Sequence, residues 1–335
     1  MLAFLLFAAA AAAGPHPSDP KLFKDWTVAC DNGRACEAIA LIPTNAEPGD
    51  WLTLRVERGG APGARPRLSL ASDESGEEIR PASLWADGNK LPVRFGADAA
   101  VGEGTEAVVA ALRSAGRLEA RDGAGHPLGL VSLAGASAAL LYMDDRQQRI
   151  GTATALARPG PKPATAVPPP PAYPVVQAAA GSKKPPRRLA KAEWTKRRNQ
   201  ACGEVQPGDD GAPDFYRLDA AHSLASIPVR CLSGAYNAAT LLLVAGETGP
   251  WRPPAYDYPV DSGGEAGDGT AYNADWSDKD GALFMFMKGR GLGDCGNRER
   301  FVWDGARFRL VDQARLDECR GSIEWMPTWH AEVRR

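Results

Sequence analysis

Residues 281–325 contain the stretch that decides the fold, and it begins G-A-L-F-M-F-M-K-G-R-G-L-G-D-C-G at 281–296. It continues as F-V-W-D-G-A-R-F-R-L-V-D at 301–312 and ends as D-E-C-R-G-S-I-E-W at 317–325. Two apolar runs flank a glycine-rich corner with Cys295, a tight turn follows, and Cys319 lies where the next strand ends. The pattern predicts a β-meander closed by a disulfide.

An apolar run of twelve residues, L-A-F-L-L-F-A-A-A-A-A-A, occupies positions 2–13. It is too short to cross a bilayer, which takes about 20 residues in a helix. Its length and the small residues Ala11 and Ala13 are typical of a secretory signal peptide, although no Lys or Arg precedes the run. We therefore expect a signal peptide at 1–14, a periplasmic or secreted protein, and no transmembrane segment in the mature chain.

Six cysteines follow this run, and an even number of cysteines in an exported protein indicates disulfides. They are Cys30, Cys36, Cys202, Cys231, Cys295 and Cys319. No C-x-x-C pair is present, so the sequence has no zinc or thioredoxin-like motif. The last four cysteines allow three connectivities, of which Cys202–Cys231 with Cys295–Cys319 closes the shortest loops.

The first two cysteines bracket the hairpin signal Asn32-Gly33. A two-residue loop leaves the cysteines offset. A three-residue loop that includes Arg34 places Cys30 directly opposite Cys36, where a cross-strand disulfide can form. We predict the longer loop, with residue 33 or 34 in the left-handed conformation.

The length of 335 residues suits two domains, because a domain usually has about 150 residues. A segment at 158–188 holds ten of the 28 prolines and resembles a semi-rigid polyproline II spacer. It separates an N-terminal β-rich domain at 21–157 from a C-terminal β-rich disulfide domain at 189–331. The expected fold class is mainly β, or β-rich α+β. It consists of two small antiparallel β domains with few short helices, stapled by disulfides and joined by a Pro-rich linker.

Helices are expected at 105–114, 136–148 and 189–200. The strands expected in the first domain are 51–58, 67–71, 78–85, 90–95, 117–121 and 128–132. Those expected in the second domain are 215–218, 227–231, 240–244, 272–276, 283–287, 301–303 and 308–312. The pair 272–276 and 283–287 is expected to form a hairpin.

Two basic features are candidates for ligand contact. The stretch Lys183–Arg198 holds eight basic residues and one acidic residue, which suits contact with an anionic surface. The alternative is a solvated helix that leads into the second domain. In the glycine-rich corner, Lys288 and Arg290 beside the backbone of Gly291 and Gly293 predict a small anion or ligand site. The corner lacks the strand–helix context of a nucleotide site.

Trp251, Tyr256 and Tyr258 lie in a Pro/Gly-rich loop, which suits an aromatic platform for a glycan or a partner. The alternative is that these rings cap the core of a β domain. The net charge of −2 gives no reason to expect nucleic-acid binding. We predict no catalytic residues, no cofactor and no metal, because no G-x-S-x-G or metal-ligand motif occurs.

Five motifs carry a family resemblance. They are F-x-D-W-x-V-x-C-D-N-x-x-x-C-x-A at 23–38, G-A-Y-N at 234–237, K-G-R-G-L-G-D-C-G at 288–296, W-D-G-x-x-F-R-L at 303–310 and E-C-R-G at 318–321. Through them the chain resembles the bacterial six-cysteine envelope family named domain of unknown function 1176. The resemblance implies a secreted, periplasmic protein of a Gram-negative bacterium without an assigned activity.

The first domain also resembles the invasion-associated locus B family. It shares W-x-V-x-C at 26–30 and S-L-A-G-A-S-A-A-L at 132–140. It lacks the central cysteine pair of that family, so the implied role in host interaction is not carried over. Neither family supplies catalytic residues for this chain.

We therefore expect a non-enzymatic binding or interaction module of the cell envelope, with an envelope protein or glycan as its partner. The alternative is a glycan-directed hydrolase, or another envelope enzyme, whose carboxylates the sequence does not locate.

Overall fold

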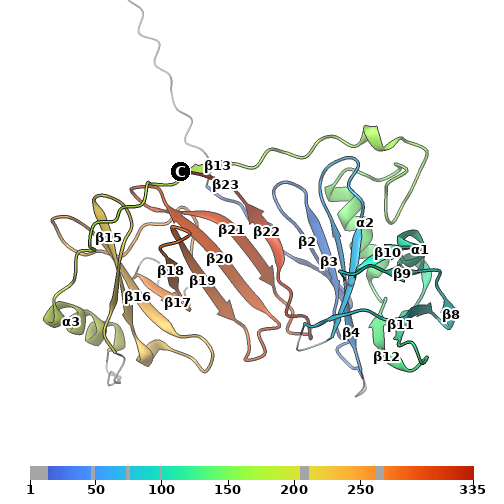
Figure 1. Ribbon diagram of the computed structural model, residues 1–335, viewed down its shortest axis with the longest axis horizontal. Helices are drawn as coiled ribbons and strands as arrows, with labels where there is room; N and C mark the ends of the chain where they lie inside the picture. The colour runs from blue at the N-terminus through green and yellow to red at the C-terminus, as the bar shows by residue number, and fades with distance from the viewer. Residues whose placement is uncertain (1–13, 47–49, 73–75, 99, 204–210, 261–267) are drawn as a thin grey trace, which may run out of the picture.

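The computed structural model describes residues 14–46, 50–72, 76–98, 100–203, 211–260 and 268–335. The expected signal peptide therefore lies outside the described residues except for its last position. The described chain forms two β-rich bodies side by side, the N-terminal one blue to green and the C-terminal one yellow to red (Figure 1). This confirms the expected fold class. Within the described ranges, no helix has the length and apolar character that a membrane crossing takes.

Six strands of the N-terminal domain form an antiparallel meander in chain order. They are β1 Lys21–Phe23, β2 Trp26–Cys30, β3 Cys36–Ala40, β4 Leu52–Arg58, β5 Arg67–Ser72 and β6 Glu78–Ile79. A second sheet has the order β12-β11-β7-β8, and β9 pairs with β10. These strands are β7 Ser83–Ala86, β8 Asn89–Lys90, β9 Arg94–Phe95, β10 Val101–Glu103, β11 Arg117–Arg121 and β12 Pro127–Ser132. The helices are α1 Thr105–Ser114 and α2 Ala136–Arg146.

Prolines divide two strands that were expected to be continuous. The expected strand 78–85 is split into β6 and β7 around Pro81, and the expected strand 90–95 into β8 and β9 around Pro92. Proline lacks the amide hydrogen that a β-ladder requires, which explains both breaks. The two expected helices of this domain are confirmed as α1 and α2.

The β2–β3 hairpin has the predicted three-residue loop. Cys30 pairs directly with Cys36, their Cα atoms are 4.0 Å apart, and the two form a disulfide. Arg34 has a φ of 61°, the left-handed conformation expected at this position. The Asp31 carboxylate accepts two backbone amide hydrogen bonds of 2.8 Å within the loop. Local turn chemistry thus fixes the register that lets this disulfide form.

Polar contacts buried in the core join the elements of the N-terminal domain. The indole of Trp26, which is fully buried, donates to the carbonyl oxygen of Ser132 at 3.0 Å. Arg58 and Asp144 form an ion pair of 2.8 Å in which neither side chain is exposed. The same Asp144 accepts the backbone amide of Leu156 at 2.9 Å. A buried charge is stable only when it has such partners. The bonds of Asp144 therefore hold β4, α2 and the chain after α2 together.

The C-terminal domain contains two antiparallel sheets. The first, in chain order, comprises β14 Asp214–Arg217, β15 His222–Pro228, β16 Ala239–Gly246 and β17 Thr270–Tyr272. The second, also in chain order, comprises β18 Asp275–Ser277, β19 Ala282–Lys288, β20 Gly296–Trp303, β21 Phe308–Leu316 and β22 Met326–His330. The 3₁₀ turn η1 Ala164–Ala166 and the helix α3 Lys191–Cys202 precede them, and the 3₁₀ turn η2 Arg230–Leu232 lies between β15 and β16. The last sheet is the meander predicted from 281–325.

The stretch 272–276, expected as one strand, belongs to two sheets. Tyr272 ends β17, which pairs with β16, whereas Trp276 lies in β18, which pairs with β19. Asn273 between them has a φ of 45°, and this left-handed residue interrupts the extended chain. The expected strand 227–231 is only the end of β15, and η2 follows it.

The remaining disulfides are Cys202–Cys231 and Cys295–Cys319, which confirms the pairing with the shortest loops. The first attaches the end of α3 to η2. The second attaches the β19–β20 corner to the loop that follows β21. Each disulfide thus closes a part of the C-terminal domain that the sheets alone do not hold.

The segment between the domains contacts both of them. The hydroxyl of Tyr173 donates to the carboxylate of Asp31 at 2.8 Å. Directly afterwards, β13 Val175–Gln177 pairs in parallel with β23 Glu332–Arg334. Figure 1 shows this segment crossing above the sheets before it reaches β13. The linker boundaries at 158 and 188 stay a prediction.

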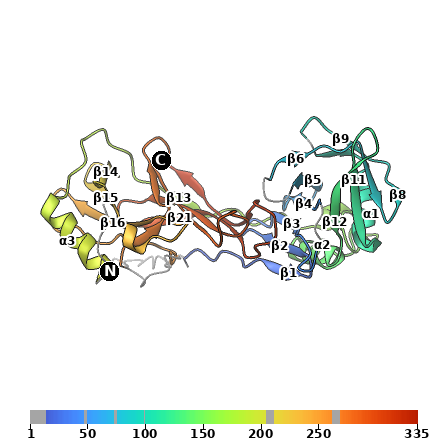
Figure 2. The ribbon, with the colours of Figure 1, turned by 90° about the horizontal axis from the view of Figure 1, so that it is seen from below.

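The two domains meet through an apolar cluster at the β2, β3 and β22 strands. Its members are Ala29, Ile39, Leu41, Leu316 and Met326. Around it, Arg320 donates to the carboxylate of Asp25 at 2.5 Å and to the carbonyl oxygen of Ile42 at 2.7 Å. Arg55 reaches Glu324 at 3.0 Å. In Figure 2 the red strands of the C-terminal domain reach the blue strands of the N-terminal domain at this place.

Candidate ligand-binding groove

A groove of about 820 Å³ lies over one face of the β18–β22 sheet and extends to Asp31 of the N-terminal domain. Cross-strand pairing places two rows of side chains on its floor, because residues paired across a sheet share a face. The first row is Phe284, Arg300, Asp312 and His330, and the second is Phe286, Arg298, Ala314 and Pro327. The volume is within the range of about 300–1,000 Å³ typical of small-molecule sites.

The groove has an exposed apolar wall. Phe284 and Phe286 are each 37% exposed, although both lie in the middle of a sheet, and Leu292 is 47% exposed. Trp325 completes the wall, and its indole donates to the carbonyl oxygen of Gly293 at 3.0 Å, which fixes the ring. A cluster of exposed large apolar side chains on one face is typical of a binding surface.

The opposite end of the groove is polar and tightly bonded. Asp312 accepts from the Nε of Arg300 at 2.5 Å and contacts the Nδ1 of His330 at 2.5 Å. The backbone of His330 exchanges two hydrogen bonds, of 2.8 and 2.9 Å, with the side chain of Asn32. The ring of Tyr173 packs edge-on against the His330 imidazole, with 4.6 Å between the ring centres. Both domains and the linker therefore build this end.

Asp31 extends the polar end into the N-terminal domain. Burial raises the pKa of this carboxyl above its ordinary value, and the hydrogen bonds from Tyr173 and from the loop amides oppose that rise. Because the same carboxylate shapes the β2–β3 loop and receives the Tyr173 hydroxyl, its position is fixed by three contacts. Asp31 is therefore a fixed wall of the groove.

Two cations on the phenylalanine-bearing face of the groove have no bonded partner among the described residues. Among the described residues, the side chains of Lys288 and Arg298 make no ion pair and no hydrogen bond, and both line the groove. Of the carboxylates that line it, Asp312 is paired with Arg300, whereas Asp31 and Glu299 accept hydrogen bonds from uncharged groups, Glu299 from Gln313 at 3.0 Å. Glu299 pairs with Met285 across the strands, so it lies on the alternating set of residues opposite to Arg298. An anion that lies between Lys288 and Arg298 therefore meets two cations that have no bonded partner among the described residues.

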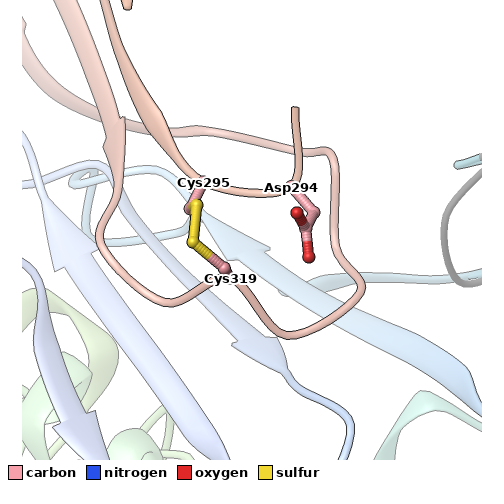
Figure 3. A group of neighbouring side chains, drawn as sticks. All are labelled: Asp294, Cys295 and Cys319. Carbon is pink, nitrogen blue, oxygen red and sulfur yellow. A yellow bond between two sulfur atoms is a disulfide. The ribbon is translucent and has the colours of Figure 1, made fainter. Parts of the chain in front are cut away.

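A group of potential metal ligands lies next to the groove. Donor atoms of Asp294, Cys295 and Cys319 lie within 4.8 Å of one another. Figure 3 shows the two sulfur atoms bonded to each other, with the Asp294 carboxylate beside them. The carboxylate accepts from the Nε of Arg290 at 2.6 Å and from the amide of Gly321 at 2.9 Å. The thiolate form that binds metals is absent from a disulfide, so this group is a structural corner.

Arg290 acts inside this corner. Although burial opposes the effect, its hydrogen bond and that of the Gly321 amide lower the pKa of Asp294 below the ordinary value. Of the other residues predicted for an anion site, Lys288 and Gly293 line the groove, whereas Gly291 lies against the Tyr236 ring. Lys288 is thus the predicted site residue whose charge faces the groove without a partner among the described residues.

The three aromatic residues predicted as a platform are packed against core residues. Trp251 is 4% exposed and its ring lies 6.3 Å from that of Phe215. Tyr256 stacks on Phe308 with 5.5 Å between the ring centres, and Tyr258 packs against the same cluster. These contacts correspond to the alternative in which the rings cap the core.

The basic stretch Lys183–Arg198 is partly bound to its own domain. Arg187 donates to the carbonyl oxygens of Gly246 and Gly249 at 3.0 and 2.8 Å. Arg197 pairs with Glu193 at 2.9 Å. The exposed charges of the stretch belong mainly to lysines, and contact with an anionic surface stays a prediction.

The groove residues other than Lys288 and Gly293 were not predicted from the sequence. In L-F-M-F-M-K at 283–288 both alternating sets are apolar, so periodicity does not show which set faces the core. In the structure Leu283 and Met285 are buried, whereas Phe284 and Phe286 face the groove. The signal present in the sequence was Arg298 and Arg300 on the paired strand, since two arginines on alternate positions mark the outward face.

Comparison with known proteins gives one family. The family model described as "Protein of unknown function (DUF1176)" matches residues 20–332. The "Uncharacterized protein YpfG" of Escherichia coli (strain K12) is 29% identical over 333 residues, which cover 92% of each chain. No solved structure matches. The resemblance of the first domain to the invasion-associated locus B family stays a prediction.

Proposed function

This chain belongs to the DUF1176 family of proteins of unknown function, and from that premise we propose that it is a non-enzymatic binding protein of the cell envelope. Its ligand occupies the groove over the β18–β22 sheet. The observation that carries the proposal is the combination of exposed phenylalanines with two cations that have no partner among the described residues. A cluster of exposed large apolar side chains beside charged ones is typical of a binding surface.

The envelope location is part of the proposal. Disulfides form and persist in oxidising compartments, and this chain has three of them and no free cysteine among the described residues. The apolar run at 2–13 agrees with export. A protein built in this way meets ligands such as envelope lipids, glycans and exported proteins.

A second candidate function rests on the Asp312–His330 pair. A carboxylate bonded to a histidine at 2.5 Å, with both side chains partly exposed in a groove, has the composition of an acid–base pair. It supports the glycan-directed hydrolase as the alternative. The alternative predicts that the purified protein releases reducing ends from envelope glycans and that Asp312→Asn abolishes the release. The binding function predicts that neither the wild-type protein nor Asp312→Asn releases reducing ends.

In-cell photocrosslinking tests the binding function. Phe286 is replaced by the photoreactive benzoylphenylalanine, and the matched control carries the same residue at Leu22, which is 47% exposed on β1 outside the groove. We expect one discrete adduct, identified by mass spectrometry, at position 286 and not at position 22. Identical adduct patterns at both positions, or no adduct at 286, would overturn the proposal.

A further inference from the structure

We propose that the ligand of the groove is an anionic amphiphile: a molecule with an apolar chain or ring system and one acidic head group. This inference rests on the proposed function and specifies its ligand class. The apolar body lies along Phe284, Phe286 and Trp325, and the acidic group lies between Lys288 and Arg298.

The position of the head group follows from strand register. Arg298 pairs directly with Phe286, and Lys288 is two residues further along β19 on the same face. Lys288 and Arg298 are therefore diagonal neighbours, a relation in which residues are about 7–8 Å apart. Long cationic side chains at that separation reach one shared anion beside the Phe286 ring.

The charges of the surrounding elements support an acidic ligand. Asp312 of β21 is bonded to Arg300 and His330, and Glu299 of β20 is bonded to Gln313. Among the described residues of the face that carries Phe284 and Phe286, Lys288 and Arg298 are cations that no acid pairs with. A cationic head group at this position would be repelled by both cations, and a neutral one would form no ion pair with them.

The shape of the groove supports a small amphiphile. Its volume of about 820 Å³ suits one ligand of small-molecule size, with room for an apolar chain. The apolar wall follows the strand direction from Phe286 to Phe284, and it ends at the bonded group of His330, Asp31 and Tyr173. The cations lie beside one end of the apolar wall. A ligand with an elongated apolar body and a charge at one end fits this arrangement.

A titration series that varies only the head group tests the inference. The probes are dodecanoate, dodecyl maltoside and dodecyltrimethylammonium, each below its micellar concentration, and acetate as the anion without a chain. Isothermal titration calorimetry of the full-length mature protein gives each affinity. We expect dodecanoate to bind with one site and at least about tenfold more tightly than the neutral or the cationic amphiphile, because a charge-assisted bond is lost with the head group. Acetate is expected not to bind.

Matched variants locate the binding. The pair Lys288→Gln and Arg298→Gln is expected to remove the preference for dodecanoate, and Phe286→Ser to weaken all three amphiphiles by at least about tenfold. The controls are Lys279→Gln, an exposed lysine of the β18–β19 turn, and Leu22→Ser, an exposed leucine outside the groove. Equal thermal unfolding of all variants shows that folding is retained. A further variant, Phe284→Tyr, changes the same wall conservatively.

The outcomes separate the ligand class from the function. Equal affinity for the three amphiphiles, or a dodecanoate affinity unchanged by the two glutamines, overturns the anionic amphiphile. If a discrete adduct still forms at position 286 in cells, the proposed binding function stands with another ligand class. If neither amphiphile binding nor an adduct at 286 is found, both proposals fail.

Discussion

Glu37 provides a pH-dependent test of how the two domains are joined. Glu37 is 4% exposed on β3, and its carboxylate meets the guanidinium of Arg55 at 2.5 and 3.0 Å. Arg55 also contacts Glu57 at 3.1 Å and, across the domain boundary, Glu324 at 3.0 Å. Burial raises the pKa of Glu37 from 4.5 to about 7, against the opposing effect of Arg55.

The magnitude follows from proton linkage. Because the pKa is higher in the folded protein, the contribution of Glu37 to stability is fully present below pH 4.5 and is lost as the pH rises through about 7. At about 1.4 kcal/mol for each unit of pKa, the free energy of unfolding falls by about 2–3 kcal/mol between pH 5 and pH 8 on account of this group.

Urea unfolding at pH 5, 6, 7 and 8 measures this fall. In Glu37→Gln the side chain does not titrate, so the variant is expected to lack the loss of about 2–3 kcal/mol seen in the wild type. The control Glu106→Gln changes an exposed glutamate of α1 that does not contact Arg55, and it is expected to keep the wild-type pH dependence. Parallel pH profiles for wild type and Glu37→Gln would refute the reasoning.

Three further predictions concern stability. Arg58→Met is expected to cost about 3–5 kcal/mol in urea unfolding, because it leaves the fully buried Asp144 without its cation, and a cost below about 1 kcal/mol would contradict this. Loss of the disulfide in the double variant Cys295→Ala and Cys319→Ala, which releases a loop of 24 residues, is expected to cost about 3 kcal/mol, and an unchanged melting temperature speaks against it. Gly135→Ala places a Cβ atom 1.7 Å from a backbone oxygen of β1 at a φ of 100°, so we expect a loss of at least about 2 kcal/mol, and wild-type stability would show that this packing is wrong.

Local chemistry was readable from the sequence. The Asn32-Gly33 turn gave the register of Cys30 and Cys36, since loop length alone decides which residues face each other. The helix at Thr105–Ser114 was predicted at its observed ends from an N-cap candidate, its apolar face and Gly116 after its end. The order of strands in the last sheet follows the chain, and the expected strands 283–287, 301–303 and 308–312 lie within β19, β20 and β21.

Contacts between distant residues were not readable. Arg320 bonds to Asp25, and Asn32 bonds to His330, across 295 and 298 positions of the chain. Neither pair leaves a periodic signal, because each depends on how the domains pack. The linker likewise shows only its prolines in the sequence, whereas its bond from Tyr173 to the N-terminal domain requires the assembled fold.

Identifying the groove required both local sequence patterns and contacts between distant residues. Lys288 was identified from the composition of the glycine-rich corner, whereas Arg290 bonds to Asp294 four residues later, and its contact with a ligand stays a prediction. Phe284 and Phe286 belong to a run in which both alternating sets of residues are apolar, so the sequence does not show which set faces the core. Sheet pairing was required to show that these rings lie beside Arg298.

Fluorine NMR tests the central claim that the groove is the binding surface. The mature protein is labelled with 4-fluorophenylalanine, the signals are assigned by single Phe→Tyr substitutions, and spectra are compared before and after addition of envelope extract. We predict that the signals of Phe284 and Phe286 shift or broaden, while those of the buried Phe301 and Phe308 stay unchanged. Binding that leaves the Phe284 and Phe286 signals in place would contradict the account.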